Sequence, residues 1–140
     1  MSRVQLAINV ENLDEAIDFY SRLFDAVPAK VKPGYANFAI VEPPLKLVLF
    51  ENQGKGGSIN HLGVEVQTTE EVLTAEDRLT RADMVTTGVD ETQCCYAEKT
   101  EVWVDGPDGV RWEWYVKHAD SDQFDNVVID PSQSKRKCCA

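Results

Sequence analysis

The sequence predicts an α+β fold in which two βαβββ modules form one curved mixed sheet, a cup with the helices outside. Three observations carry this prediction: a repeat at a spacing of 56 residues, alternating apolar residues at the start of each copy, and a helix-start signal after each. Neither half has enough strands to bury a sheet face alone, so we expect the halves to pair. The domain should span residues 1–118, with modules at about 1–56 and 57–118.

The opening strand of each copy shows the repeat. Residues 5–10 (QLAINV) align with residues 61–66 (HLGVEV), and every second residue is apolar in both. Alternation of this kind is typical of a strand with one face against a core. We expect the apolar face to pack beneath a helix, which leaves Gln5 and His61 on the concave face.

A helix should follow each opening strand. Asn12 stands three residues before Glu15, and Thr68 stands three residues before Glu71, which is the spacing of a capping box. Apolar residues then recur at helical spacing in both copies: Leu13, Ile17, Tyr20 and Phe24 in the first, and Val72, Ala75, Leu79 and Ala82 in the second.

Short strands complete each module. The first copy has β-rich segments at 35–41 and 45–51, and the second has one strand within 84–97 and a hairpin of 101–105 with 111–116. The pattern stops near Ala119, and we expect residues 119–140 to form a flexible C-terminal tail.

Composition limits the functional classes. The net charge of −10 over 140 residues argues against nucleic acid and anionic membranes, which attract basic proteins, and favours a small-molecule partner. No apolar run approaches the roughly 20 residues of a membrane span. The N-terminus lacks a signal-peptide layout, so we expect a cytoplasmic protein, a monomer or homodimer. Its four cysteines form two adjacent pairs, which we interpret as free thiols in a reducing compartment.

Three polar residues are candidate metal ligands. Alternation places Glu113 of the last strand on the same concave face as Gln5 and His61. One imidazole, one carboxylate and one amide suit Fe(II), Mn(II), Ni(II), Co(II) or Zn(II) and leave open positions for catalysis. The position in the first module that corresponds to Glu113 falls near Val48, which cannot ligate. The alternative is that these residues only hydrogen-bond within a polar cup.

The βαβββ repeat, with Gln5 and His61 opening the first strands and Glu113 in the last, resembles the glyoxalase, bleomycin-resistance and extradiol-dioxygenase superfamily. The resemblance covers residues 1 to about 118. It implies the vicinal oxygen chelate fold, with a divalent metal in the cup at the positions of Gln5, His61 and Glu113.

The adjacent pair Cys94–Cys95 points to soft, thiophilic ions such as As(III) or Cd(II), although buried cysteines often serve only as small apolar residues. Together with this pair, several segments resemble the organoarsenical carbon–arsenic lyases, also known as cadmium-induced proteins: residues 32–40, 44–49, 60–65, 102–109 and 112–115.

This resemblance implies a non-haem Fe(II) dioxygenase that uses O2 as co-substrate. It would break the carbon–arsenic bond of trivalent organoarsenicals, methylarsenite and aromatic arsenicals among them, and release arsenite. Ni(II), Co(II) or Mn(II) are possible substitutes for iron. Cys94 and Cys95 would hold the arsenic.

Five further residues have open roles. Tyr96, Trp103 and Tyr115 are candidates to line the substrate pocket, with ordinary core packing as the alternative, above all for Trp103. Cys138 and Cys139 follow the basic run 135–137 and could capture arsenic, or could be incidental.

Two rival functions stay open at this point. A glyoxalase-type isomerase would use a metal to polarise a hemithioacetal; the missing fourth ligand and the cysteine pair, which that chemistry does not need, stand against it. A non-enzymatic cadmium- or arsenite-binding protein would need the cysteines but show no turnover. The sequence fixes neither the metal bound nor the organic group on arsenic.

Overall fold

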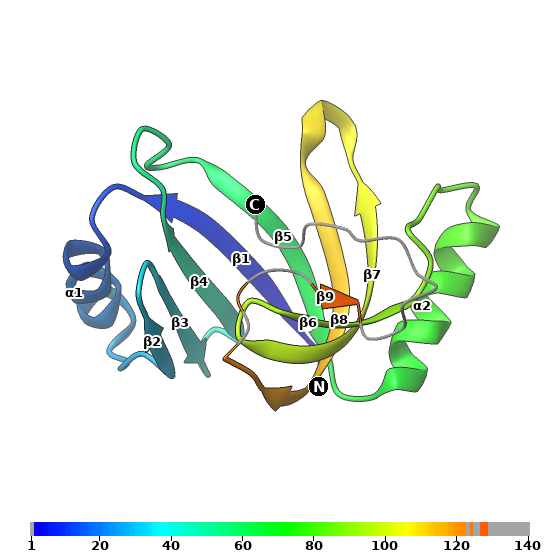
Figure 1. The fold of residues 1–140 in the computed structure, drawn as a ribbon, viewed down its shortest axis with the longest axis horizontal. Helices are drawn as coiled ribbons and strands as arrows, with labels where there is room; N and C mark the ends of the chain where they lie inside the picture. Colours follow the sequence, from blue (N-terminus) through cyan, green and yellow to red (C-terminus); the bar gives the residue numbers. More distant parts are fainter. Residues whose placement is uncertain (1, 123, 125–126, 129–140) are drawn as a thin grey trace. The chain divides into compact units, whose positions relative to one another are not determined.

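The computed structural model describes residues 2–122, 124 and 127–128. They fall into two compact units: an N-terminal unit, Arg3–Leu62, and a C-terminal unit that begins at Gly63 and also includes Ser2. Figure 1 shows the elements of both.

The N-terminal unit is one βαβββ module. Its strands follow the order β2-β3-β4-β1, with the first half of β5 beyond β1. Strand β1 runs parallel to β4, whereas β3 is antiparallel to both β2 and β4. The elements are β1 (Arg3–Val10), α1 (Leu13–Phe24), β2 (Lys30–Lys32), β3 (Tyr35–Ile40), β4 (Leu45–Glu51) and β5 (Ile59–Val66).

The C-terminal unit repeats the pattern from the second half of β5. Its strand order is β5-β8-β7-β6-β9, and β7 is antiparallel to both β6 and β8. The further elements are α2 (Thr69–Arg81), β6 (Asp90–Cys94), β7 (Ala97–Asp105), a 3-10 turn (Pro107–Gly109), β8 (Arg111–Asp120) and β9 (Val127–Val128). The predicted βαβββ pattern is therefore present in both units.

In the N-terminal unit, α1 packs on β3 and β4. The core beneath it consists of Leu13, Ala36, Phe38, Ile40, Leu47 and Leu49. The alternating residues Leu6, Ile8 and Val10 pack against this core from β1, as predicted. The other face of β1 carries Gln5 and Asn9, which are 5% and 4% exposed. Polar residues buried this deeply need partners, and this is the face on which the candidate ligands lie.

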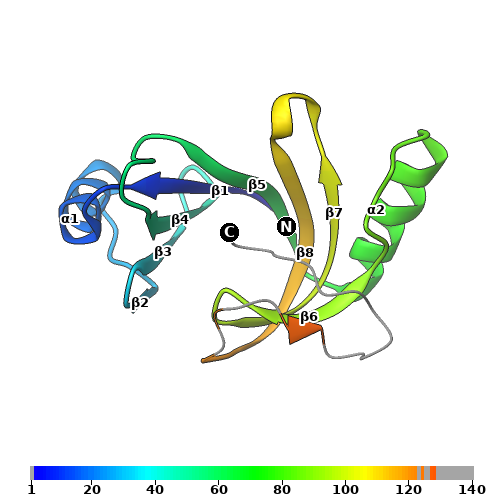
Figure 2. The same ribbon diagram turned by 45° about the horizontal axis from the view of Figure 1, so that its top comes forward.

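In the C-terminal unit, α2 packs on β7 and β8 (Figure 2). The core beneath it consists of Val66, Val72, Val102 and Val116, with Val64 and Trp114 packed at its edge. Because side chains alternate along β8, Glu113 and Tyr115 project from the opposite face.

Both predicted helix caps are present. Asn12 Oδ1 accepts a hydrogen bond from the Glu15 amide at 2.9 Å, and Thr68 Oγ1 accepts one from the Glu71 amide at 3.2 Å. These side chains satisfy amides that the first helical turn leaves without backbone partners. No helix of the described residues is long and apolar enough to cross a membrane.

The strand boundaries differ from the prediction in three places. Strand β2 is a three-residue segment, too short to show alternation. Strand β7 begins at Ala97, and β8 continues opposite it to Asp120. Strand β9 pairs with β6, so part of the segment expected to be a flexible tail belongs to the sheet. Cys138 and Cys139 lie outside the described residues.

Candidate functional site

Gln5 and His61 form a contact in the N-terminal unit. Gln5 comes from β1 and His61 from β5, and they are 5% and 3% exposed. The Gln5 side-chain amide Nε2 lies 3.1 Å from His61 Nε2. Two strands separated by 56 residues in sequence thus bring an amide and an imidazole into hydrogen-bond contact, at the repeat-related positions that the sequence singled out.

Asn60 sets the orientation of the His61 ring. Its Oδ1 lies 2.8 Å from His61 Nδ1, while its Nδ2 donates to Asn9 Oδ1 at 3.1 Å. The second bond fixes which end of the Asn60 amide faces the imidazole. Because Oδ1 can only accept, Nδ1 of His61 carries the proton and Nε2 carries the lone pair. An imidazole held by such an outer partner is the usual form of a metal ligand.

The Gln5–His61 pair fits a divalent metal. His61 Nε2 could bind a metal through its lone pair. In this structure the lone pair accepts a hydrogen bond from the Gln5 amide. The same amide carries an oxygen on the same carbon, and rotation of its terminal torsion exchanges the two atoms. A neutral nitrogen and a neutral oxygen suit borderline to hard divalent ions such as Fe(II) and Mn(II).

Glu113 lies in a buried ionic cluster of the C-terminal unit. Lys99 Nζ forms an ion pair with Glu113 Oε1 and a second one with Glu101 Oε2 at 3.0 Å. The three side chains are 5%, 1% and 3% exposed for Lys99, Glu113 and Glu101. A carboxylate held in this way is an anionic oxygen donor within the C-terminal unit.

The cluster shifts the proton equilibria of two members. Burial raises the pKa of Glu101 to about 7, with Lys99 opposing the rise and Glu113 adding to it. Burial disfavours the charge of Lys99, but Glu101 and Glu113 outweigh burial and raise the pKa of its ammonium. Lys99 therefore stays positively charged in the metal-free protein.

Tyr115 extends this polar face. Its hydroxyl donates to Glu65 Oε2 at 2.9 Å, and Lys99 Nζ lies 5.2 Å from the centre of its ring. Tyr115 is 3% exposed, which suits a pocket wall as well as a core contact. Its contacts place it beside the Glu113 cluster.

Val48 provides no fourth ligand. It is buried in β4, paired across the sheet with Ala7 and Asn37. Within the residues that the structure describes, no three His, Cys, Asp or Glu side chains gather into a metal-binding group. The candidate ligands Gln5, His61 and Glu113 are not such a group, because Gln5 is an amide.

The Cys94–Cys95 pair lies at the tight turn between β6 and β7. Cys95 and Tyr96, its two central residues, have φ values of 53° and 62°. A two-residue hairpin of type I′ needs positive φ at both positions, which normally selects Asn or Gly. Non-glycine residues there cost about 1–3 kcal/mol each, and strain of this kind clusters at functional sites.

Neighbouring contacts hold this turn. The Cys95 amide donates to the Phe124 carbonyl at 3.0 Å, and the Ser121 amide donates to the Tyr96 carbonyl at 2.9 Å. The Tyr96 and Phe124 ring centres lie 5.4 Å apart. Tyr96 is thus fixed beside the cysteine pair.

The two sulfurs project together. Cys94 Sγ and Cys95 Sγ lie 3.3 Å apart, a non-bonded distance. Cys94 is fully buried and packs with Cys95 against Trp103, whose ring lies 4.3 Å from the Arg111 guanidinium carbon. Trp103 therefore contacts the thiol pair as well as the core.

The expectation of free thiols at this pair is wrong for this structure. No free cysteine is present among the described residues, and Cys94 and Cys95 are not bonded to each other. Reduction has to precede any binding of As(III) by both sulfurs.

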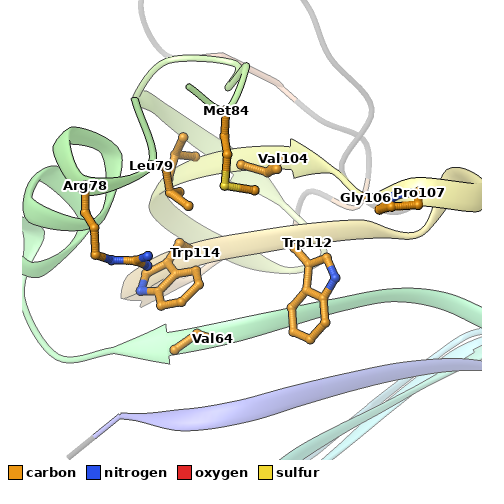
Figure 3. Close-up of a pocket in the computed structure, with 10 residues that line it drawn as sticks. Val64, Arg78, Leu79, Met84, Val104, Gly106, Pro107, Trp112 and Trp114 are labelled. Atoms are coloured by element: carbon orange, nitrogen blue, oxygen red, sulfur yellow. The ribbon is translucent and has the colours of Figure 1, made fainter. Parts of the chain in front are cut away.

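An apolar pocket of about 480 Å³ lies on the other face of the C-terminal unit. Figure 3 shows Met84 and the rings of Trp112 and Trp114 around it, with Arg78 beside Trp114. Trp112 and Trp114 alternate with Glu113 along β8 and so project away from the ionic cluster. This pocket is not where the candidate ligands point.

Sequence reasoning gave no site role to four polar residues of these clusters: Glu65, Asn60, Lys99 and Glu101. Alternation places Glu65 on the same face as His61, but that placement alone assigns it no role. Asn60 precedes His61 directly, which is a weak signal. Lys99 lies between the predicted strands, and Glu101 opens the predicted strand 101–105, whose side chains were not assigned to faces.

Residues 3–114 match the Glyoxalase/Bleomycin resistance protein/Dioxygenase superfamily, and the chain belongs to that superfamily. Its fold is also that of a Mn(II)-bound glyoxalase from Novosphingobium aromaticivorans. That structure aligns with a TM-score of 0.59 at 16% identity, over 88% of this chain and 43% of that one. The predicted vicinal oxygen chelate fold is therefore confirmed.

Two relatives narrow the comparison. Cadmium-induced protein CadI of Mycobacterium tuberculosis is 60% identical over 124 residues, which cover 89% of this chain and 82% of that protein. The trivalent organoarsenical cleaving enzyme of Thermomonospora curvata is 53% identical over 139 residues, which cover 96% of this chain and 92% of that enzyme.

Proposed function

We propose that the protein is an Fe(II)-dependent dioxygenase that cleaves the carbon–arsenic bond of trivalent organoarsenicals and releases arsenite. Methylarsenite and aromatic arsenicals are the substrates, and organoarsenical resistance is the outcome. The observation that carries the proposal is the adjacent cysteine pair in a strained turn, in a chain 53% identical to a protein named for this cleavage.

Gln5, His61 and Glu113 would hold the metal. Nδ1 protonation of His61, imposed by Asn60, supports this role, as do the deep burial of all three side chains and their mixed donor chemistry. Bound iron(II) supplies a redox-active centre with positions left open for dioxygen. Ni(II), Co(II) and Mn(II) would occupy the same donors.

Cys94 and Cys95 would bind arsenic after reduction. Thiolates are soft ligands and As(III) is thiophilic, so two sulfurs 3.3 Å apart form a suitable pincer. The tight turn fixes both side chains, which lowers the entropy cost of holding the substrate in one orientation. Trp103 and Tyr96 would then lie beside the organic group, and we assign Tyr115 to the same pocket.

The test uses separate measurements for metal and arsenic. Protein is reduced with a phosphine, freed of metal, loaded anaerobically with Fe(II) and given methylarsenite in air. His61→Ala and Glu113→Ala should lose both iron and arsenite release, while Gln5→Ala should lose less because water can replace an amide ligand. Full activity in either of the first two would refute the metal assignment.

The cysteine variants complete the test. Cys94→Ser and Cys95→Ser should keep iron but lose arsenical binding and arsenite release, because a hydroxyl is a hard donor. Replacing Cys138 and Cys139 should leave most activity at saturating substrate. Full arsenite release by both single serine variants would overturn the proposal.

A cadmium- or arsenite-binding protein is the second candidate, favoured by the 60% identity to a protein named cadmium-induced. It would bind one equivalent through the cysteines, show no turnover, and be indifferent to changes at the three metal ligands. A glyoxalase-type isomerase would tolerate both cysteine changes. The same variants therefore separate all three functions.

A further inference from the structure

Lys99 bridges two buried carboxylates, and the metal site as described does not use this arrangement. Its ammonium contacts Glu113 Oε1 on β8 and lies 3.0 Å from Glu101 Oε2 on its own strand, β7. All three side chains are at most 5% exposed. Burial of three ionisable groups is costly, so an arrangement that only stabilised the fold would be better served by apolar residues.

The geometry distinguishes the two carboxylates. Glu113 is the one proposed to bind metal, whereas Glu101 has no such role. Lys99 lies on the same strand as Glu101, two residues away, and reaches Glu113 across the β7–β8 pair. A buried ammonium with two partners can release one and keep the other.

We propose that Lys99 and Glu101 are positioning residues for metal binding, an inference that rests on the proposed function. In the metal-free protein, Lys99 holds the Glu113 carboxylate in place as a resident cation. When Glu113 binds the metal, Lys99 keeps its ion pair with Glu101. Metal therefore competes with the Lys99 ammonium for Glu113, and Glu101 lowers the cost of that exchange.

The exchange predicts opposite effects for the two residues. Lys99→Met removes the competing cation and leaves two buried carboxylates without one, so the metal-free protein should melt at a lower temperature and bind metal about tenfold more tightly. Glu101→Gln leaves Lys99 with Glu113 as its charged partner. Metal binding then isolates a buried ammonium, and affinity should fall about tenfold.

Mn(II) is the probe, because thiolates bind it poorly and the cysteine pair therefore does not interfere. Free Mn(II) is measured by electron paramagnetic resonance, and melting temperatures are recorded with and without the metal. Lys117→Met and Glu98→Gln are matched controls. Lys117 pairs with exposed Asp120 and Glu98 accepts from Gln93, so neither change should alter Mn(II) affinity.

Opposite shifts in Mn(II) affinity support the inference, and equal or absent shifts overturn it. If Lys99→Met does not fold, unchanged affinity in Glu101→Gln is sufficient to overturn it. Glu113→Gln separates the two levels of the argument. If Glu113→Gln binds Mn(II) as tightly as the wild type, both the metal-ligand assignment and this inference are wrong. If Glu113→Gln loses Mn(II) affinity while the Lys99 and Glu101 variants keep wild-type affinity, only this inference is wrong.

Discussion

Asn60 should control metal affinity through His61 without touching the metal. Asn60→Ala removes the acceptor 2.8 Å from His61 Nδ1, so the ring is no longer held with its lone pair on Nε2. Loss of such an outer partner typically weakens metal binding by about 10–100-fold, or roughly 1.4–2.8 kcal/mol. The His61 ring itself loses one hydrogen bond and its fixed tautomer, so we expect the lower half of this range. Mn(II) titration of the reduced protein measures it.

Asn52→Ala is the matched control. Asn52 and Asn60 both donate to Asn9 Oδ1, at 2.9 Å and 3.1 Å, so both changes remove one bond from the same amide network. Within the described part of the chain, Asn52 forms no hydrogen bond with His61. Equal Mn(II) affinity in the two variants would refute the idea that Asn60 orients the imidazole.

Three further outcomes are expected. Because burial raises the pKa of Glu101 from 4.5 to about 7, the folded metal-free protein keeps a proton between these pH values that the unfolded chain has lost. Its unfolding free energy should therefore fall by roughly 3 kcal/mol as pH rises through that interval. Urea unfolding measures this dependence, and the Glu101→Gln variant should lack it. Asn12→Ala should cost about 1 kcal/mol of unfolding free energy by removing the α1 cap, and Asn12→Ser should restore most of it. Trp103→Phe should change the ranking of methyl against aryl arsenicals in competition assays, whereas a uniform loss would indicate packing alone.

Periodicity was sufficient for the elements with strong patterns. The alternation of Leu6, Ile8 and Val10 identified the helix-facing side of β1, and therefore the buried side that carries Gln5. The caps at Asn12 and Thr68 were equally readable, because a capping box depends on residues three apart in sequence. Local rules of this kind need no knowledge of the tertiary structure.

Long-range contacts explain what was missed. Strand β9 exists through its pairing with β6, and its two residues carry no pattern of their own. Lys99 looks like a surface lysine in sequence, and its burial follows from Glu113 on the neighbouring strand. The conformation of Cys95 and Tyr96 was also unreadable, since neither residue type is favoured at positive φ. Cys95, Tyr96 and Lys99 all lie in environments that their residue types normally avoid, and all three lie where function is proposed.

Arsenite formation by the wild-type protein tests the central claim most directly. Phosphine-reduced protein is loaded with Fe(II) under nitrogen, mixed with excess methylarsenite and then exposed to air, and arsenic species are separated and quantified. The account predicts arsenite in excess over protein only when both iron and air are present. Arsenite no higher than in the iron-free sample, from protein shown to bind both iron and methylarsenite, would contradict it.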